Sequence, residues 1–272
     1  MPRARPGQAA VGGVALMPPD RLWRRLLAEG VGSLFLALIV IGSGIAAQRL
    51  SPGDLGLELF ENAAATAGGL FAIILMFGPV SGAHFNPVVS FADAALGGLP
   101  WRSAAAYLGA QVAGCVAGAI TANLMFGLKA ITLSTKVRAS GPHFLSEAVA
   151  TLGLLLVIFG LARTHRSHWA ASAVGAYIGA AYFFTSSTSF ANPAITIGRM
   201  LSDTFAGIAP SSAPTFVAAQ VLGAILAVAL VRALYPAPAA ARAIDVGAVE
   251  DEAPDPPVVG LAREGGARGG RP

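Results

Sequence analysis

Two stretches of eleven residues decide the fold of this chain: HFNPVVSFADA at 84–94 and FANPAITIGRM at 190–200. Each contains an Asn-Pro pair, Asn86-Pro87 in the first and Asn192-Pro193 in the second, behind a stretch rich in Gly, Ser and Thr. Asn is a preferred N-cap, and Pro is favoured at the first helical position. Each pair is followed by only about ten helix-compatible residues, which is half the length that a membrane span needs. The two stretches therefore predict two half-length helices.

Long apolar segments flank these stretches on both sides. Each holds 19 to 24 residues, enough at about 1.5 Å per residue to cross a hydrocarbon core of roughly 30 Å. Small residues dominate them, which lets helices in lipid approach closely. The predicted spans are 26–48, 58–78, 103–126, 144–162, 168–186 and 213–234.

The composition agrees with an integral membrane protein in a lipid bilayer. Of the 272 residues, 55% are hydrophobic and only 12% are charged, against about 25% charged in soluble domains. The net charge of +4 comes without a dense Lys/Arg run, which excludes a nucleic-acid binder. Cys115 is the single cysteine, so disulfide frameworks and Cys-based zinc sites are excluded, and no metal or cofactor is expected.

The two halves of the chain repeat one order of polar residues. Glu29 stands near the start of the first span, in AEGVGSLFLALIVIG, and Glu147 near the start of the fourth, in SEAVATLGLLLVIFG. An Asn-Pro pair follows each Glu, and Gln111 or Gln220 then lies in the last span of the half. Three spans per half is an odd number, so the halves must insert with opposite topology, as in many transport proteins.

The repeat predicts the chemistry of the centre. Two half-helices that enter from opposite faces bring their N-termini together at the bilayer midplane. Irregular backbone is tolerated there only where it is buried or lines a water-filled path. Each Asn caps its helix through its carbonyl oxygen and keeps its amide as a donor for the oxygen of a passing solute. Both helix dipoles place positive partial charge at this point, which repels cations. We therefore expect a passive channel for small neutral solutes.

These paired motifs resemble the major intrinsic protein family, the aquaporins and aquaglyceroporins, over about residues 26–235. The resemblance implies an all-α membrane protein of six transmembrane helices and two re-entrant half-helices, with one pore per subunit in a homotetramer. It implies that Glu29 and Glu147 brace the re-entrant loops. The implied motif residues are Asn86, Pro87, Val88, Asn192, Pro193 and Ala194. The implied pore carbonyls belong to Gly82, Ala83, His84, Thr188, Ser189 and Phe190.

One feature departs from typical water channels, in which an Arg of the selectivity filter directly follows the second motif. This chain has Ile195 at that position. Counting from the motifs places the rest of the implied filter at Thr66, Ala180 and Ser189. Such a filter is wide and uncharged, and it resembles that of bacterial members associated with arsenic resistance. We therefore expect passage of water, glycerol-like polyols and arsenous acid. The alternatives are a strict water channel and a gated or non-conducting family member.

Three further interpretations concern single residues. Arg199, one turn beyond Ile195, either adds a charge to the outer mouth or, as we favour, ends the short helix and meets solvent. His84 is expected to present a carbonyl and not to bind a metal. No Ser/His dyad, paired aspartates or metal-ligand cluster falls in the spans, so we do not expect an enzyme. An ion-coupled carrier would need titratable groups in the path. Glu58 and Glu61 at the start of the second span are interpreted as a solvated rim, which leaves Glu29 and Glu147 as the intramembrane carboxylates.

The remaining predictions concern topology and domains. Basic residues before the first span and after the fourth and sixth place both termini in the cytoplasm of a multi-pass inner-membrane protein. Residues 1–20 and 236–272 lack hydrophobic periodicity and are expected to be disordered tails, and Met17 is an alternative start. The channel domain is expected at 21–235, with repeats at about 26–126 and 144–235.

Overall fold

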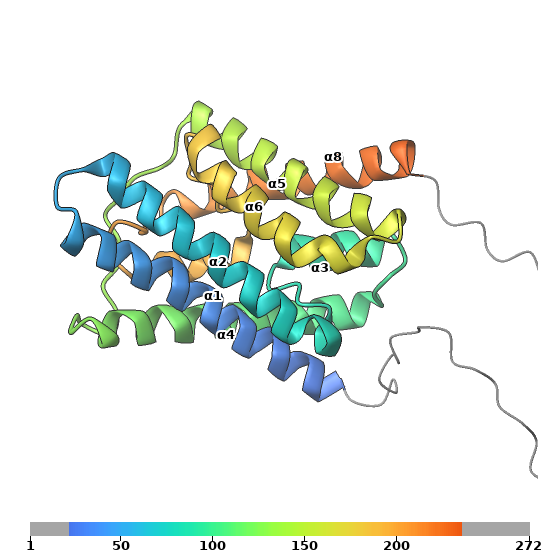
Figure 1. The fold of residues 1–272 in the computed structure, drawn as a ribbon, viewed down its shortest axis with the longest axis horizontal. Coiled ribbons are helices and arrows are strands. Elements are labelled where there is room, and N and C mark those ends of the chain that lie inside the picture. Colours follow the sequence, from blue (N-terminus) through green and yellow to red (C-terminus); the bar gives the residue numbers. More distant parts are fainter. Residues whose placement is uncertain (1–21, 236–272) are drawn as a thin grey trace, which may run out of the picture. The chain divides into compact units, whose positions relative to one another are not determined.

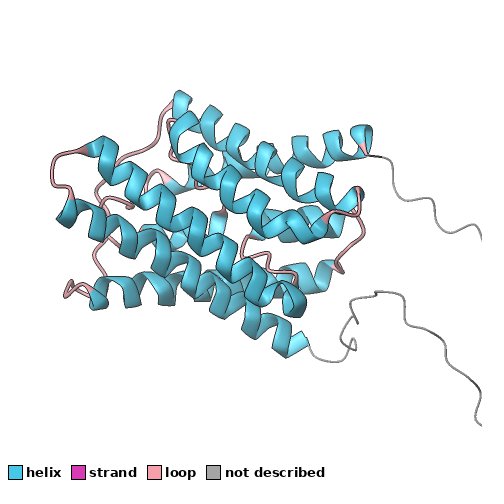
Figure 2. Ribbon diagram, viewed as in Figure 1, coloured by secondary structure: helices cyan, strands magenta, loops and turns pink. Residues whose placement is uncertain are grey.

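The computed structural model describes residues 22–235, and the two predicted tails lie outside this range. The described chain is entirely helical, with eight α-helices and one short 3-10 helix and no strand (Figures 1 and 2). The elements are α1 (Leu22–Leu50), α2 (Leu55–Ser81), α3 (Pro87–Ala95), α4 (Trp101–Met125), α5 (Gly141–Arg163), η1 (Ser167–Trp169), α6 (Ala170–Phe184), α7 (Pro193–Arg199) and α8 (Ala213–Leu234).

All six predicted spans coincide with helices. Five of them, α1, α2, α4, α5 and α8, are long and apolar enough to cross a membrane. The remaining span, α6, has only 15 residues and continues from the 3-10 turn of η1, so its helical stretch begins at Ser167. The two half-helices, α3 with nine residues and α7 with seven, begin at the predicted Asn-Pro pairs. The chain is thus a multi-pass membrane protein with two short re-entrant helices.

The described chain begins and ends at the same end of the bundle. Figure 1 shows the start of α1, in blue, and the end of α8, in red-orange, at the same end of the bundle, on the right of the view. We call this the terminal end, and we call the opposite end, which holds the loop 126–140, the loop end. The helix α3 lies in the terminal half, where Arg232 near the end of α8 donates to the Ala95 carbonyl. The helix α7 lies in the loop half, because the residues directly after it accept hydrogen bonds from residues 132–134.

Close helix contacts follow the repeat. In the first half α1 packs against α4 and α2, and in the second half α5 packs against α8 and α6. A Cβ atom on Gly114 of α4 would lie 2.1 Å from the Gly30 carbonyl oxygen of α1. At the equivalent place in the second half, a Cβ on Gly223 would lie 2.4 Å from the Ala148 carbonyl oxygen. Only glycine permits the backbones to come so close, as expected for helices that associate in lipid.

The loop end is covered by two loops that hydrogen-bond to each other. The backbone N–H of Thr132 donates to the Leu201 carbonyl at 3.1 Å, and that of Ser134 donates to Met200 at 2.9 Å. Farther along, the N–H of Ala209 donates to the Lys136 carbonyl at 2.8 Å. The segment after α7 is therefore folded back under residues 132–136 instead of continuing as helix.

Candidate functional site

The two Asn-Pro pairs meet at the centre of the bundle through reciprocal hydrogen bonds. The side-chain amide of Asn86 donates to the carbonyl oxygen of Ala191 at 2.8 Å, and that of Asn192 donates to the carbonyl oxygen of Phe85, also at 2.8 Å. Each amide group carries two hydrogens. Each Asn therefore uses one to hold the opposite loop and keeps a second for another acceptor.

The same two side chains cap the half-helices, as predicted. The Asn86 Oδ1 atom accepts from the Val88 backbone N–H at 3.1 Å. The Asn192 Oδ1 atom accepts from the N–H groups of Ala194 at 2.9 Å and Ile195 at 3.3 Å. Both Asn residues have extended backbone, and Pro occupies the first helical position of each helix. The caps fix the orientation of the amides because the oxygen of each is already engaged.

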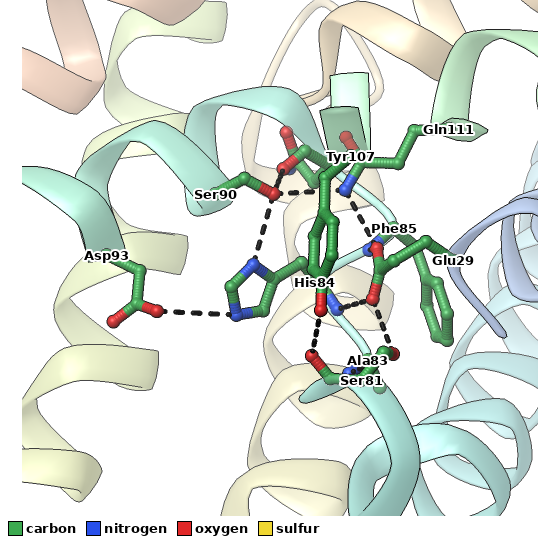
Figure 3. A network of polar contacts seen from close by, with 10 residues as sticks. Glu29, Ser81, Ala83, His84, Phe85, Ser90, Asp93, Tyr107 and Gln111 are labelled. Atoms are coloured by element: carbon green, nitrogen blue, oxygen red, sulfur yellow. Dashed lines mark hydrogen bonds and ion pairs between the residues drawn. The ribbon is translucent and has the colours of Figure 1, made fainter. Parts of the chain in front are cut away.

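Glu29 is fully buried and holds the first re-entrant loop (Figure 3). Its carboxylate accepts from the backbone N–H of His84 at 3.0 Å and of Phe85 at 2.7 Å. It also accepts from the Ser81 hydroxyl at 2.6 Å and from the Gln111 amide at 2.8 Å. A buried carboxylate with four donors is strongly bound to them, since each bond is charge-assisted. Glu29 therefore joins α1 to the loop and to α4.

Glu147 performs the same task in the second half. Its carboxylate accepts from the backbone N–H of Phe190 at 2.8 Å and of Ala191 at 2.9 Å, and from the Gln220 amide at 2.7 Å. The Gln220 amide also donates to the Thr196 hydroxyl at 3.0 Å, just as the Gln111 amide donates to the Ser90 hydroxyl in the first half. The repeat seen in the sequence thus extends to single hydrogen bonds.

Backbone strain in the two loops follows one pattern. Relative to the Asn at the end of each loop, the same three positions have positive φ: Gly82, Ala83 and Phe85 in the first loop, and Thr188, Ser189 and Ala191 in the second. Five of these six residues carry a Cβ atom, and each such left-handed residue costs about 1–3 kcal/mol. The bonds to the two carboxylates offset this cost and hold the loops in place.

The carboxylates also determine which way the loop carbonyls face. In a planar trans peptide, the carbonyl points opposite to the N–H of the next residue. The N–H groups of His84 and Phe85 point at Glu29, so the carbonyls of Ala83 and His84 point away from it. By the same reasoning, the carbonyls of Ser189 and Phe190 point away from Glu147.

These loops line a cavity of about 580 Å³ inside the bundle. Its lining extends from Ser167 and His168 at the terminal end, past Asn86 and Asn192, to Arg199 in the loop half. Of the predicted carbonyl residues, five line it: Gly82, Ala83, His84, Ser189 and Phe190. Thr188 is not among the lining residues, and neither are the buried Pro87, Val88, Pro193 and Ala194, whose side chains pack elsewhere.

Three of the four predicted filter residues line this cavity: Thr66, Ser189 and Ile195. The prediction of Ala180 is wrong, because its side chain is exposed on the outer face of α6. Tyr182, two residues later, lines the cavity instead, and its hydroxyl lies 3.1 Å from that of Thr66. The Ser189 hydroxyl is buried without a hydrogen-bond partner among the described residues.

The interpretation of Arg199 as a solvated helix end is also wrong. Its side chain is only 2% exposed and lines the cavity. The guanidinium lies over the Phe190 ring, 3.4 Å from its centroid, and its Nε atom donates to the Ala206 carbonyl. The folded-back segment after α7 supplies that carbonyl and covers the arginine, which a short helix end on its own would leave in water.

A contact between His84 and Asp93 in the terminal half was not predicted from the sequence. The His84 ring lies between the Ser90 hydroxyl, 3.1 Å from Nδ1, and the Asp93 carboxylate, 3.7 Å from Nε2 (Figure 3). Both His84 and Asp93 line the cavity. The described residues contain no group of three or more potential metal-ligating side chains, so this pair stands without further ligands.

Comparison with known proteins gives one consistent result. The sequence matches the major intrinsic protein family over residues 19–191 and 170–253. It is 47% identical over 213 residues to the aquaglyceroporin AqpS of Rhizobium meliloti (strain 1021), which covers 78% of this chain and 90% of that protein. It is 35% identical over 175 residues to aquaporin NIP6-1 of Arabidopsis thaliana, covering 60% of this chain and 54% of that protein.

A solved structure has the same fold. The aquaglyceroporin from Plasmodium falciparum superposes with a TM-score of 0.62 at 19% sequence identity, covering 78% of this chain and 96% of that one. The inverted repeat, the paired Asn caps and these matches agree with one another. The chain therefore belongs to the major intrinsic protein family, a family of membrane channels and not of enzymes.

Proposed function

We propose that this protein is a passive channel for small neutral solutes: water, glycerol-like polyols and arsenous acid. The observation that carries the proposal is the cavity past Asn86 and Asn192, where each amide retains one hydrogen for a solute oxygen. The carbonyls of Ala83, His84, Ser189 and Phe190 would accept hydrogen bonds from the same solute as it moves. The name of the Rhizobium relative, an aquaglyceroporin, supports the assignment of polyols.

The width of the path is proposed to depend on Ile195. Its aliphatic side chain, which carries no charge, lines the cavity directly after the second motif. Thr66 and Tyr182 also line the cavity and add two hydroxyl groups, and Ser189 belongs to the same lining although its hydroxyl is buried. A lining that combines hydroxyl groups with aliphatic carbon suits polyols, which carry both kinds of group. Arsenous acid, a neutral trihydroxide at pH 7, has similar surface chemistry.

The protein is further proposed to form a homotetramer in the inner membrane with its terminal end in the cytoplasm. Arg24 and Arg25 lie in the first turn of α1, and Arg163 and Arg232 lie in the last turns of α5 and α8, all at that end. The excess of positive charge there supports this orientation.

Osmotic shrinking and re-swelling of proteoliposomes tests the proposal, with glycerol and arsenous acid as osmolytes. The wild type is expected to re-swell through solute entry, and Ile195→Arg is expected to slow entry at least tenfold while water still passes. Ile195→Val, which stays apolar, is the matched control and is expected to retain solute entry. Water flux without solute entry in the wild type would instead identify a strict water channel. No flux of either kind would identify a closed or non-conducting protein.

A further inference from the structure

The cavity contains two charged side chains among its described lining residues, Asp93 in the terminal half and Arg199 in the loop half. The arginine is the more deeply buried of the two, with only 2% of its side chain exposed. No described carboxylate lies within 4.0 Å of its guanidinium. Its positive charge therefore acts on whatever occupies the cavity, in a medium that screens charge far less than water.

The surroundings of Arg199 hold the guanidinium in one place. One face lies on the Phe190 ring at 3.4 Å, and that ring is in turn packed edge-on against Phe216, with centroids 5.0 Å apart. The Nε atom donates to the Ala206 carbonyl. The two terminal nitrogens have no hydrogen-bond acceptor among residues 22–235, so their donors remain available to a solute in the cavity.

Arg199 lies one helical turn beyond Ile195, about 6 Å farther toward the loop end at 1.5 Å per residue. Thr66 and Tyr182, whose hydroxyls lie 3.1 Å apart, line the same cavity as Arg199. A solute that approaches from the loop end therefore meets a fixed positive charge before it reaches the apolar Ile195 level.

We propose that Arg199 is the residue that excludes cations from this pore. It does so one helical turn farther toward the loop end than Ile195. The charge would raise the energy of any cation in the cavity and leave neutral solutes unaffected. Its free donors would bind solute hydroxyls. Ile195 would then select solutes by size and Arg199 by charge, on two different turns of α7. The pore can therefore be wide at Ile195 and still exclude cations. This inference rests on the proposed channel function.

Urea and guanidinium are a suitable pair of probes, because they share a planar shape and similar size but differ in charge. Uptake of each into proteoliposomes would be compared for the wild type and for Arg199→Gln, which keeps a polar side chain but loses the charge. We expect the wild type to admit urea and exclude guanidinium. Arg199→Gln is expected to raise guanidinium uptake at least tenfold, with urea uptake changed less than threefold.

Two variants are matched controls. Arg199→Lys keeps the charge and is expected to exclude guanidinium as the wild type does. Lys136→Gln removes one positive charge from the same end of the protein, where the amine donates to the Phe205 carbonyl outside the cavity lining. Lys136→Gln is expected to exclude guanidinium as well, because its charge does not face the cavity.

If folded Arg199→Gln still excludes the guanidinium ion, the assignment is wrong. It is also wrong if Lys136→Gln admits the guanidinium ion as fast as Arg199→Gln does. If Arg199→Gln does not purify in folded form, Arg199→His replaces it. Its guanidinium exclusion should weaken between pH 5.5 and pH 8 as the imidazole loses its charge, and a pH-independent uptake would count against the proposal. Absence of urea and glycerol flux in the wild type would instead contradict the channel function itself.

Discussion

Asp93 and Arg199 occupy equivalent positions in the two half-helices and carry opposite charges. Each lies seven residues after the Asn that caps its helix. Each contacts the residue two positions before that Asn, Asp93 at 3.7 Å from His84 and Arg199 at 3.4 Å from the centre of the Phe190 ring. The symmetric backbone thus holds an asymmetric pair of charges, one in each half of the cavity.

The cross-loop hydrogen bond of Asn192 predicts a joint loss of stability and flux. Asn192→Ala removes the donor to the Phe85 carbonyl and the cap of α7. The expected cost is about 2–4 kcal/mol of unfolding free energy, with at least a tenfold fall in glycerol permeability. Thermal unfolding in detergent and proteoliposome swelling measure the two effects. Asn62→Ala is the control, since Asn62 is also buried and does not itself line the cavity, and its amide donates to the Val40 carbonyl and the Ser43 hydroxyl. It should lose stability but keep its flux per folded protein.

The bonds to Glu147 predict that even an isosteric change disrupts the second loop. In Glu147→Gln, an amide NH₂ replaces an oxygen that now accepts from backbone or Gln220 N–H groups, so donors would face donors. We expect a loss of about 3 kcal/mol in stability and a parallel fall in flux. Denaturant titration of the purified protein measures the first. Asp54→Asn, at the N-cap of α2 on the surface, is expected to cost far less. Equal effects of the two changes would show that Glu147 has no special role.

The position of Tyr182 predicts which residue of α6 controls solute size. Tyr182→Ala removes a ring from the cavity lining and is expected to raise glycerol permeability at least threefold. Ala180→Phe adds a ring on the exposed outer face of the same helix and is expected to leave permeability unchanged. Swelling rates normalised to folded protein compare the two. The opposite pattern would restore Ala180 to the filter.

The hydrogen bonds of Asp203 to Thr135 predict a pH-dependent contact between the segment after α7 and the loop 126–140. Its carboxylate accepts from the backbone N–H of Thr135 at 2.9 Å and from the Thr135 hydroxyl, and these bonds hold its pKa below the ordinary value of 3.8. The stabilisation is therefore complete above pH 3.8 and is lost as pH falls through the lower folded-state pKa. Amide exchange at Thr135 should be faster in Asp203→Asn than in the wild type at pH 7. The two rates should converge at acidic pH, and a constant ratio would contradict the assignment.

The sequence was sufficient for every feature that depends on local pattern or on the repeat. The six spans follow from runs of apolar residues, and the caps follow from Asn before Pro. The order Glu, Asn-Pro, Gln marked Glu29 and Glu147, and both carboxylates face the loop that their position in the repeat implies. These features were predictable because one short segment, or two equivalent ones, contains all the information.

The errors arose where a residue's orientation depends on distant segments. Ala180 was placed by counting back from Asn192, but the face that α6 turns to the cavity is determined by its packing against α2. Arg199 was placed in solvent because nothing local shows that the Ala206 carbonyl returns to cover it. One signal was available, since Asp93 and Arg199 both follow their capping Asn by seven residues, and alignment of the repeats pairs them.

The dispersed partners of Glu29 have a consequence for how the chain is made. The donors to this carboxylate come 52 to 82 residues later in the sequence, the last of them Gln111 in α4. When α1 leaves the ribosome, none of these groups has emerged with it, and a lone carboxylate in hydrocarbon is costly. The first helix must therefore stay near water or within the insertion machinery, or carry a protonated Glu29, until α4 has been translated. The Glu29 carboxylate therefore gains its full set of donors in the membrane only after all four helices of the first half have been made.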